Sequence, residues 1–200
     1  MSTFTLPTIP CELAWRQPPA MWAVTPAGLS INAGPTTDWF RDPAGAVNKG
    51  DAPVALFTPP DLSFRLSAQV TVDFAATFDA GVLFLYADAD HWAKLCFEFS
   101  PQGEPMVVSV VTRGASDDCN STVISGNMVY LRVNQQAQTT AFHYSTDGQW
   151  WHLVRYFTLG VDTPVQIGFS AQSPTGAGCQ ATFAAISYQP GAVSDLRGGA

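Results

Sequence analysis

Short segments rich in β-branched and aromatic residues recur every 8 to 15 residues along this chain, and turn-forming residues separate them. Gly and Pro, present in 16 and 15 copies, interrupt almost every segment. No window shows the i, i+3, i+4, i+7 apolar spacing of an amphipathic helix. This pattern predicts an all-β sandwich or barrel with few or no helices. We expect strands at about 28–32, 53–57, 63–74, 80–87, 91–99, 105–113, 128–134, 138–145, 150–158, 164–171 and 179–188.

The length of 200 residues suits a single domain with a substantial core. We predict one domain over residues 1–190 and a flexible tail of small and polar residues over 191–200. Thirteen Phe, six Trp and five Tyr make the chain too apolar to be disordered. The longest apolar run, residues 80–87, is far shorter than the roughly 18 residues that a membrane span needs.

Charged residues make up only 12% of the chain, about half of the typical value of roughly 25%. The net charge of −7 argues against binding to nucleic acid or to anionic membranes. Because so sparsely charged a surface leaves apolar area to cover, we favour a homodimer over a monomer. The first residues, Met1 to Pro7, contain neither a basic nor an apolar segment of a secretory signal, so we expect a cytoplasmic protein. The scattered cysteines (Cys11, Cys96, Cys119 and Cys179) are then expected to be free thiols.

Residues alternate between two faces along the expected strands. In 91–99, Trp92, Lys94, Cys96 and Glu98 lie opposite a face of small and apolar side chains. In 128–134, three apolar residues alternate with Tyr130, Arg132 and Asn134. The alternation predicts a sheet with an apolar core face and an outer face that carries aromatic and charged residues. We expect Lys94, Arg113 and Arg132 to cluster on this outer face, which is too aromatic for plain solvent-exposed surface.

Several segments in order along residues 12–188 resemble a known family. They are WRQPPAMW (15–22), TDWF (37–40), DAGVLFLYADADHWAKLCFE (79–98), VVTRGASD (110–117), YLR (130–132), YSTDGQWW (144–151), RYF (155–157) and GFSAQSPTGAG (168–178). The family is the domain of unknown function typified by a fungal protein named for regulation of enolase, in the concanavalin A-like lectin/glucanase superfamily. The chain is also similar to the non-catalytic C-terminal β-sandwich of some β-xylosidases.

This resemblance implies a concanavalin A-like jelly-roll β-sandwich of two antiparallel sheets. The chain departs from the family pattern at two places where a ligand is expected. Asp118 stands where the family often has an aromatic residue, and the family's Asp-Phe-Trp is here Asp38-Trp39-Phe40.

Catalytic and metal-binding signatures are weak. Retaining glucanases of the superfamily carry their two carboxylates on one strand as E-x-D-x-E or E-x-D-x-x-E, because a nucleophile and an acid must lie close together. The three glutamates (Glu12, Glu98 and Glu104) have no acidic residue two or four positions further along the chain. Asp88-Ala89-Asp90-His91 lacks the further oxygen ligands and the glycine of a calcium loop, so a polar hairpin tip is the favoured interpretation. The pair Asp117-Asp118 is a slightly better candidate for a cation site, but it too is weak. We therefore predict no catalytic residues, no metal site and no cofactor.

The leading functional interpretation is a non-catalytic module that holds a carbohydrate-like or small polar ligand on its concave sheet. Aromatic rings would stack on a sugar, Arg and Lys would bind an anionic or hydroxyl group, and carboxylates would accept hydroxyl protons. The predicted ligand-binding residues are Asp38, Trp39, Trp92, Lys94, Glu98, Arg113, Asp117 and Arg132. Two alternatives stay open: a regulatory protein–protein interaction domain, as the name of the enolase-related protein implies, and a sugar-active hydrolase or isomerase that uses Glu98 and Asp117.

Overall fold

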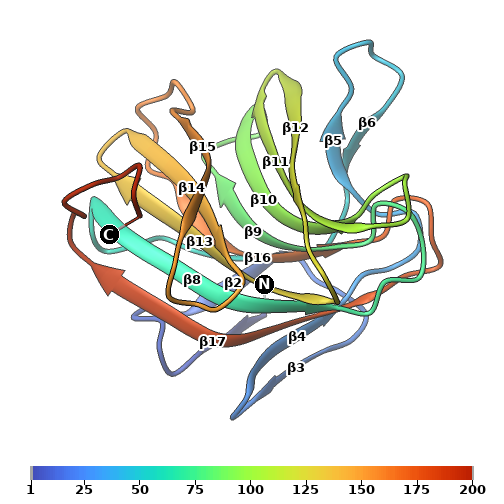
Figure 1. Ribbon diagram of the computed structural model, residues 1–200, viewed down its shortest axis with the longest axis horizontal. Helices are drawn as coiled ribbons and strands as arrows, with labels where there is room; N and C mark the ends of the chain where they lie inside the picture. Colours follow the sequence, from blue (N-terminus) through green and yellow to red (C-terminus); the bar gives the residue numbers. More distant parts are fainter. Residues whose placement is uncertain (1, 200) are drawn as a thin grey trace.

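The computed structural model describes residues 2–199, which form two large antiparallel sheets packed face to face (Figure 1). The eight-stranded sheet contains, in spatial order, β1 (Thr3–Phe4), β2 (Leu13–Gln17), β7 (Val54–Phe57), β16 (Gln166–Gln172), β9 (Ala80–Tyr86), β10 (His91–Phe99), β11 (Pro105–Arg113) and β12 (Ala115–Val123). The seven-stranded sheet contains β15 (His152–Phe157), β14 (Thr139–Ser145), β13 (Met128–Gln136), β8 (Ser63–Val72), β17 (Gln180–Pro190), β4 (Gly28–Asn32) and β3 (Trp22–Thr25). A separate hairpin pairs β5 (Trp39–Arg41) with β6 (Asn48–Gly50).

This arrangement confirms the predicted all-β jelly-roll sandwich of the concanavalin A-like type. No α-helix occurs within residues 2–199, and accordingly that part of the chain has no helix able to cross a membrane. Six strands lie outside the ranges that the sequence predicted, namely β1, β2, β3, β5, β6 and β12. The sequence of β12, ASDDCNSTV, has no apolar alternation because it forms the exposed edge of its sheet, where polar side chains are expected.

The main core lies between the two sheets and is built from one residue in two along each strand. In β8, buried and partly exposed residues alternate over all ten positions, so Leu66 and Val70 point inward. From the opposite sheet, Leu95 and Phe97 of β10 enter the same core. The alternation predicted for 91–99 and 128–134 is therefore confirmed.

A second apolar cluster lies on the outer face of the eight-stranded sheet. All seven residues of β9 are buried, which means that this strand is covered on both sides. The cover is the segment that contains β5 and β6: the Trp39 indole packs edge-on against Phe84 and Trp92, with ring centroids 5.1 and 5.7 Å apart. Trp39 Nε1 also donates a hydrogen bond to the Ala52 carbonyl at 2.9 Å. The aromatic outer face that the sequence predicted is thus largely covered by this chain's own hairpin.

The expected clustering of Arg113 and Arg132 with Lys94 is wrong. Arg132 belongs to β13 of the other sheet, where its guanidinium lies over Trp151, 3.6 Å from the ring centroid, and donates to the Gly199 carbonyl at 2.8 Å. Arg113 ends β11 on the face opposite Val110 and donates to the Thr158 carbonyl at 3.4 Å. Alternation assigns a residue to one of two faces, but it does not say which sheet contains the strand.

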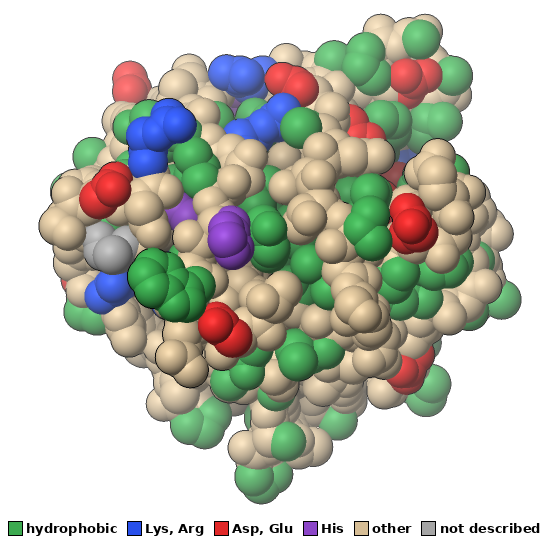
Figure 2. Space-filling view, in the orientation of Figure 1, with side chains coloured by type: hydrophobic (Ala, Val, Ile, Leu, Met, Phe, Trp, Pro, Cys, Tyr) green, Lys and Arg blue, Asp and Glu red, His purple; other side chains and the backbone are tan. Residues whose placement is uncertain are grey.

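The surface carries few charges. In the face seen in Figure 2, hydrophobic and neutral side chains predominate, and several Lys and Arg side chains lie near its upper edge, one of them beside an acidic side chain. Residues 191–199 follow β17 and include Gly199, whose carbonyl accepts the hydrogen bond from Arg132. Met1 and Ala200, the outermost residues of the predicted domain and tail, lie outside the described residues. The division into domain and tail stays a prediction.

The paired strands β7 and β16 lie so close together at Gly168 that a larger residue there should have a measurable effect on stability. A Cβ atom at this position would clash with the carbonyl group of Ala55 on β7. We expect Gly168→Ala to lower the free energy of unfolding by at least about 2–3 kcal/mol, because the backbone of two paired strands must separate. Gly34→Ala is the control, since a Cβ there meets only the Thr37 methyl at an ordinary 3.7 Å. Urea denaturation of both variants checks this, and similar losses for the two would contradict it.

Candidate functional site

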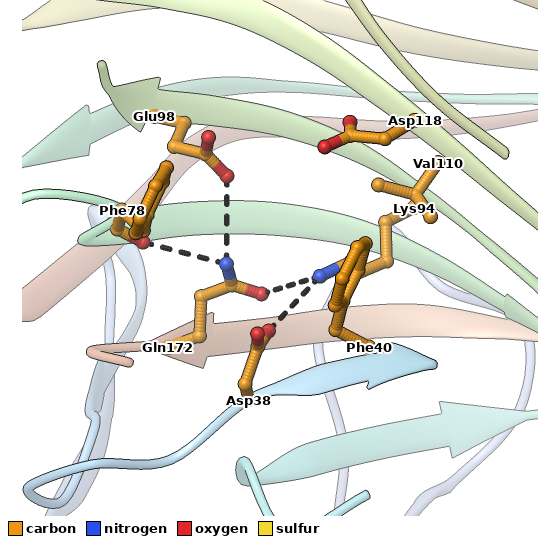
Figure 3. A pocket seen from close by; sticks show the side chains of 8 residues that line it. All are labelled: Asp38, Phe40, Phe78, Lys94, Glu98, Val110, Asp118 and Gln172. Atoms are coloured by element: carbon orange, nitrogen blue, oxygen red, sulfur yellow. Dashed lines mark hydrogen bonds and ion pairs between the residues drawn. The ribbon is translucent and has the colours of Figure 1, made fainter. Parts of the chain in front are cut away.

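A pocket of about 120 Å³ opens on the outer face of the eight-stranded sheet, beside β5 (Figure 3). Five separate parts of the chain supply its walls: the segment around β5, the loop before β9, the strands β10 and β11, the edge strand β12, and the end of β16. The lining residues are Asp38, Phe40, Phe78, Lys94, Glu98, Val110, Asp118 and Gln172. We call this cavity the acidic pocket, because three of these residues are carboxylic acids.

Lys94 is the only basic residue in the lining, and its side chain is almost fully buried. Its Nζ donates hydrogen bonds to Asp38 Oδ1 at 3.1 Å and to Gln172 Oε1 at 2.9 Å. Burial by itself lowers the pKa of Lys94, but the charges of Asp38 and Glu98 outweigh this effect and hold the pKa above its ordinary value. Lys94 therefore stays charged and fixes the positions of two acceptors.

Gln172 connects Lys94 to the other side of the pocket. While its Oε1 accepts from Lys94, its Nε2 donates to the Phe78 carbonyl at 3.4 Å and to Glu98 Oε2 at 3.5 Å (Figure 3). The amide is thus held in one orientation, with its oxygen toward the cation and its nitrogen toward the carboxyl group.

Glu98 is a buried carboxyl group with an altered protonation state. Burial raises its pKa to about 8, and the neighbouring charges of Asp118 and Asp38 act in the same direction, while Lys94 opposes them. At neutral pH Glu98 is therefore mainly a neutral acid that can donate as well as accept a hydrogen bond. Asp118 faces the same cavity from β12, and partial burial raises its pKa as well, although Lys94 works against this.

The loop before β9 holds the pocket wall in a strained conformation. Phe78 has a φ of 70°, in the left-handed region that bulky residues rarely adopt. Its neighbour Asp79 is fully buried and accepts hydrogen bonds from the backbone N–H groups of Ala75 and Ala76, at 2.9 and 2.8 Å, and from Ser173 Oγ at 2.6 Å. Because Ser173 follows Gln172 directly, Asp79 ties the loop that carries Phe78 to the strand end that carries Gln172.

Of the predicted ligand-binding residues, the structure brings three together in the acidic pocket: Asp38, Lys94 and Glu98. The predicted stacking surfaces Trp39 and Trp92 are buried against each other, so neither presents an open ring face to a ligand. The aromatic side chains that do line the pocket are Phe40 and Phe78.

Asp117 also departs from its predicted place. It pairs with Arg155, whose Nη2 lies 3.0 Å from Asp117 Oδ1, away from the pocket. Its neighbour Asp118 faces the pocket instead, since successive residues of a strand point to opposite faces. If residues 115–123 had been recognised as a strand, the alternation along it would have assigned Asp117 and Asp118 to opposite faces.

Sequence reasoning also missed Gln172, Phe40 and Phe78. Gln172 lies within the matching stretch GFSAQSPTGAG but has no signal of its own in a single sequence. Phe40 alternates with Trp39 along a strand of only three residues, which is too short for its periodicity to be recognised.

The described residues, 2–199, contain no group of three or more His, Cys, Asp and Glu side chains that could hold a metal ion. All four cysteines are free. Cys96 lies between Lys94 and Glu98 on the same face of β10, and burial raises its pKa well above its ordinary value, so it remains a neutral thiol.

The fold is that of the concanavalin A-like β-sandwich proteins, and one of its two sheets carries a polar, partly buried pocket. Residues 15–191 match the family DUF1349, whose description is "protein of unknown function". The chain belongs to this family. No sequence among curated proteins matches the chain significantly.

Solved structures share the fold. A functionally unknown protein from Saccharomyces cerevisiae aligns with a TM-score of 0.83 and 21% identity, covering 90% of this chain and 97% of the yeast one. The GH43 BlXynB protein from Bacillus licheniformis aligns with a TM-score of 0.69 and 15% identity over 88% of this chain, which corresponds to only 36% of that protein. An alginate lyase from Klebsiella pneumoniae gives a TM-score of 0.59 and 13% identity over 86% of this chain and 84% of its own. At such identities the likeness concerns the fold alone.

Proposed function

We propose that this protein is a binding module whose acidic pocket holds a small, uncharged, hydroxyl-rich ligand of the carbohydrate type. The observation that carries the proposal is the fixed row of hydrogen-bonding groups formed by Asp38, Lys94, Gln172 and Glu98 in a partly open cavity. Such a row offers alternating acceptors and donors to neighbouring hydroxyl groups, while Phe40 and Phe78 supply apolar walls for the carbon atoms of a ring.

The charges of the pocket favour a neutral ligand over an anionic one. Near pH 7 the cation Lys94 faces two carboxylates, Asp38 and Asp118, while Glu98 is mainly protonated. The lining then carries a net negative charge, which disfavours a bound anion. Neither Arg113 nor Arg132, which were expected to bind an anionic or hydroxyl group of the ligand, is part of this lining.

The test is a titration of the folded protein with neutral sugars such as xylose, arabinose, glucose and their disaccharides, followed by calorimetry or NMR. Binding of at least one sugar, with altered signals of Phe40 or Phe78, is the expected result. No binding of any of them by the folded protein would overturn the proposal.

A matched pair of variants on β12 makes the location testable. Asp118→Asn removes a carboxylate that faces the pocket, and we expect it to weaken the binding of the sugar found above by about tenfold. Asp117→Asn removes the neighbouring carboxylate, which pairs with Arg155 outside the pocket, and should leave the affinity unchanged. Calorimetry on both variants measures the difference, and equal effects would contradict the assignment of the pocket.

A second candidate function, acid-catalysed turnover of a sugar, is favoured by the protonation of Glu98. A general acid must carry a proton at the working pH, and burial, which raises the pKa of Glu98 to about 8, provides this. Asp117 cannot be the partner group of Glu98, because it points away from the pocket, whereas Asp118 faces the cavity. Turnover of a glycan panel that disappears in Glu98→Gln would support catalysis, and turnover that survives this change would exclude Glu98 from it.

A further inference from the structure

Strand β5 divides the outer face of the eight-stranded sheet into two hollows. Asp38 and Phe40 line the acidic pocket, whereas the alternate residues Trp39 and Arg41 line a second hollow, also of about 120 Å³. This separation follows from the alternating direction of side chains along an extended segment. The second hollow is lined by Arg16, Trp39, Arg41, Asn48, Lys49, Gly50, Tyr86, Ala89 and Trp92. We call it the basic hollow.

The basic hollow concentrates positive charge in an acidic protein. The whole chain has nine Lys and Arg residues and a net charge of −7, yet three of the nine line this one cavity. Arg41 is ion-paired with Asp90, so its charge is balanced. Within residues 2–199, Arg16 and Lys49 form no ion pair. Two uncompensated cations therefore face the same small space.

The positions of these two cations suit the binding of an anion. The guanidinium of Arg16 lies over the Tyr86 ring, 4.1 Å from its centroid, which holds its plane in place and leaves its N–H edges available. Lys49 donates a hydrogen bond to the Thr36 carbonyl and has further N–H donors. The Asn48 amide lies in the same lining. A fixed guanidinium, an ammonium and an amide are donors that oxyanions bind strongly.

We propose that the basic hollow is a second binding site, specific for the oxyanion group of a small ligand: a carboxylate, a sulfate or a phosphate. The site is independent of the acidic pocket, because it shares no lining residue with it. The two hollows have opposite charge, so they select different chemical groups.

The test uses pairs of probes that differ by one acidic group. Glucuronate and glucose 6-phosphate are compared with glucose, and inorganic phosphate is titrated alone, all by calorimetry at low ionic strength. We expect the acidic probes to bind to the basic hollow and their affinity to fall as the salt concentration rises from about 20 to about 200 mM. In the double variant Arg16→Gln/Lys49→Gln, the affinity for these probes should drop by about tenfold or more.

A control variant removes the same amount of charge elsewhere. Arg113 and Arg197 are exposed and outside both cavities, so Arg113→Gln/Arg197→Gln should leave the affinity for anions nearly unchanged. Asp118→Asn, which alters the acidic pocket, should not weaken anion binding either. Binding of inorganic phosphate supports recognition of the oxyanion itself, and binding of the sugar acids alone supports an acidic sugar. Absence of binding by any anion, or equal loss in the control double variant, would overturn the proposal.

Discussion

Replacing Lys94 with Met is expected to lower the free energy of unfolding by about 3–5 kcal/mol at pH 7, because the change leaves buried acceptors without their cation. Asp38 loses its partner at 3.1 Å, and Gln172 loses the donor at 2.9 Å that fixes its orientation. The loss should be smaller at pH 5, where the orphaned carboxylates of the variant take up protons more easily. Urea denaturation at both pH values measures the effect.

The chain offers a matched control for this change. Lys49, on the surface hairpin, donates only to the Thr36 carbonyl, so Lys49→Met should change the free energy of unfolding by less than about 1 kcal/mol. Comparable losses in the two variants would show that Lys94 has no special role in the pocket.

The second large effect that we expect is a dependence of the free energy of unfolding on pH, caused by Glu98. Burial raises the pKa of Glu98 in the folded protein from 4.5 to about 8, so the folded state binds this proton more tightly than the unfolded state does. The contribution of this tighter proton binding to the stability of the folded protein is fully present below about pH 4.5, and it is lost as the pH rises through about 8. We therefore expect Glu98→Gln, which is never ionised, to be more stable than the wild type at pH 9 by about 2–4 kcal/mol, since each pKa unit corresponds to about 1.4 kcal/mol.

At pH 5 the free energy of unfolding of Glu98→Gln should match that of the wild type within about 1 kcal/mol, because in the folded protein both side chains are then neutral. Glu104→Gln is the control, since Glu104 is exposed and should show no such dependence on pH. Denaturation curves between pH 5 and 9 check the expectation. A Glu98→Gln variant that remains as sensitive to pH as the wild type would contradict it.

The fold could be predicted from the sequence because its signals are local. The alternation along 91–99 placed Lys94 and Glu98 on one face, and the structure confirms that both line the same pocket. The turn residues and the absence of helical spacing likewise predicted a sandwich, since each depends on neighbours in the chain.

The rest of the pocket depends on pairings between distant residues, which one sequence does not reveal. Gln172 reaches Lys94 across 78 positions of the chain, and Asp38 reaches it across 56. The burial of Trp39 follows from the way its hairpin folds over β9 and β10, and no periodicity within 37–50 indicates this. Arg132 was misplaced because its strand belongs to the other sheet.

The order of the strands has a consequence for how the chain folds. β16 lies between β7 and β9 in one sheet, and β17 lies between β8 and β4 in the other, so the last two strands of the chain are interior strands (Figure 1). Neither sheet can become continuous before these two have been synthesised and inserted. Contacts between residues so far apart in the chain make folding slow. Until β16 and β17 are inserted, the edges of β7, β8 and β9 that they pair with in the native fold remain unpaired, and unpaired strand edges are prone to aggregation.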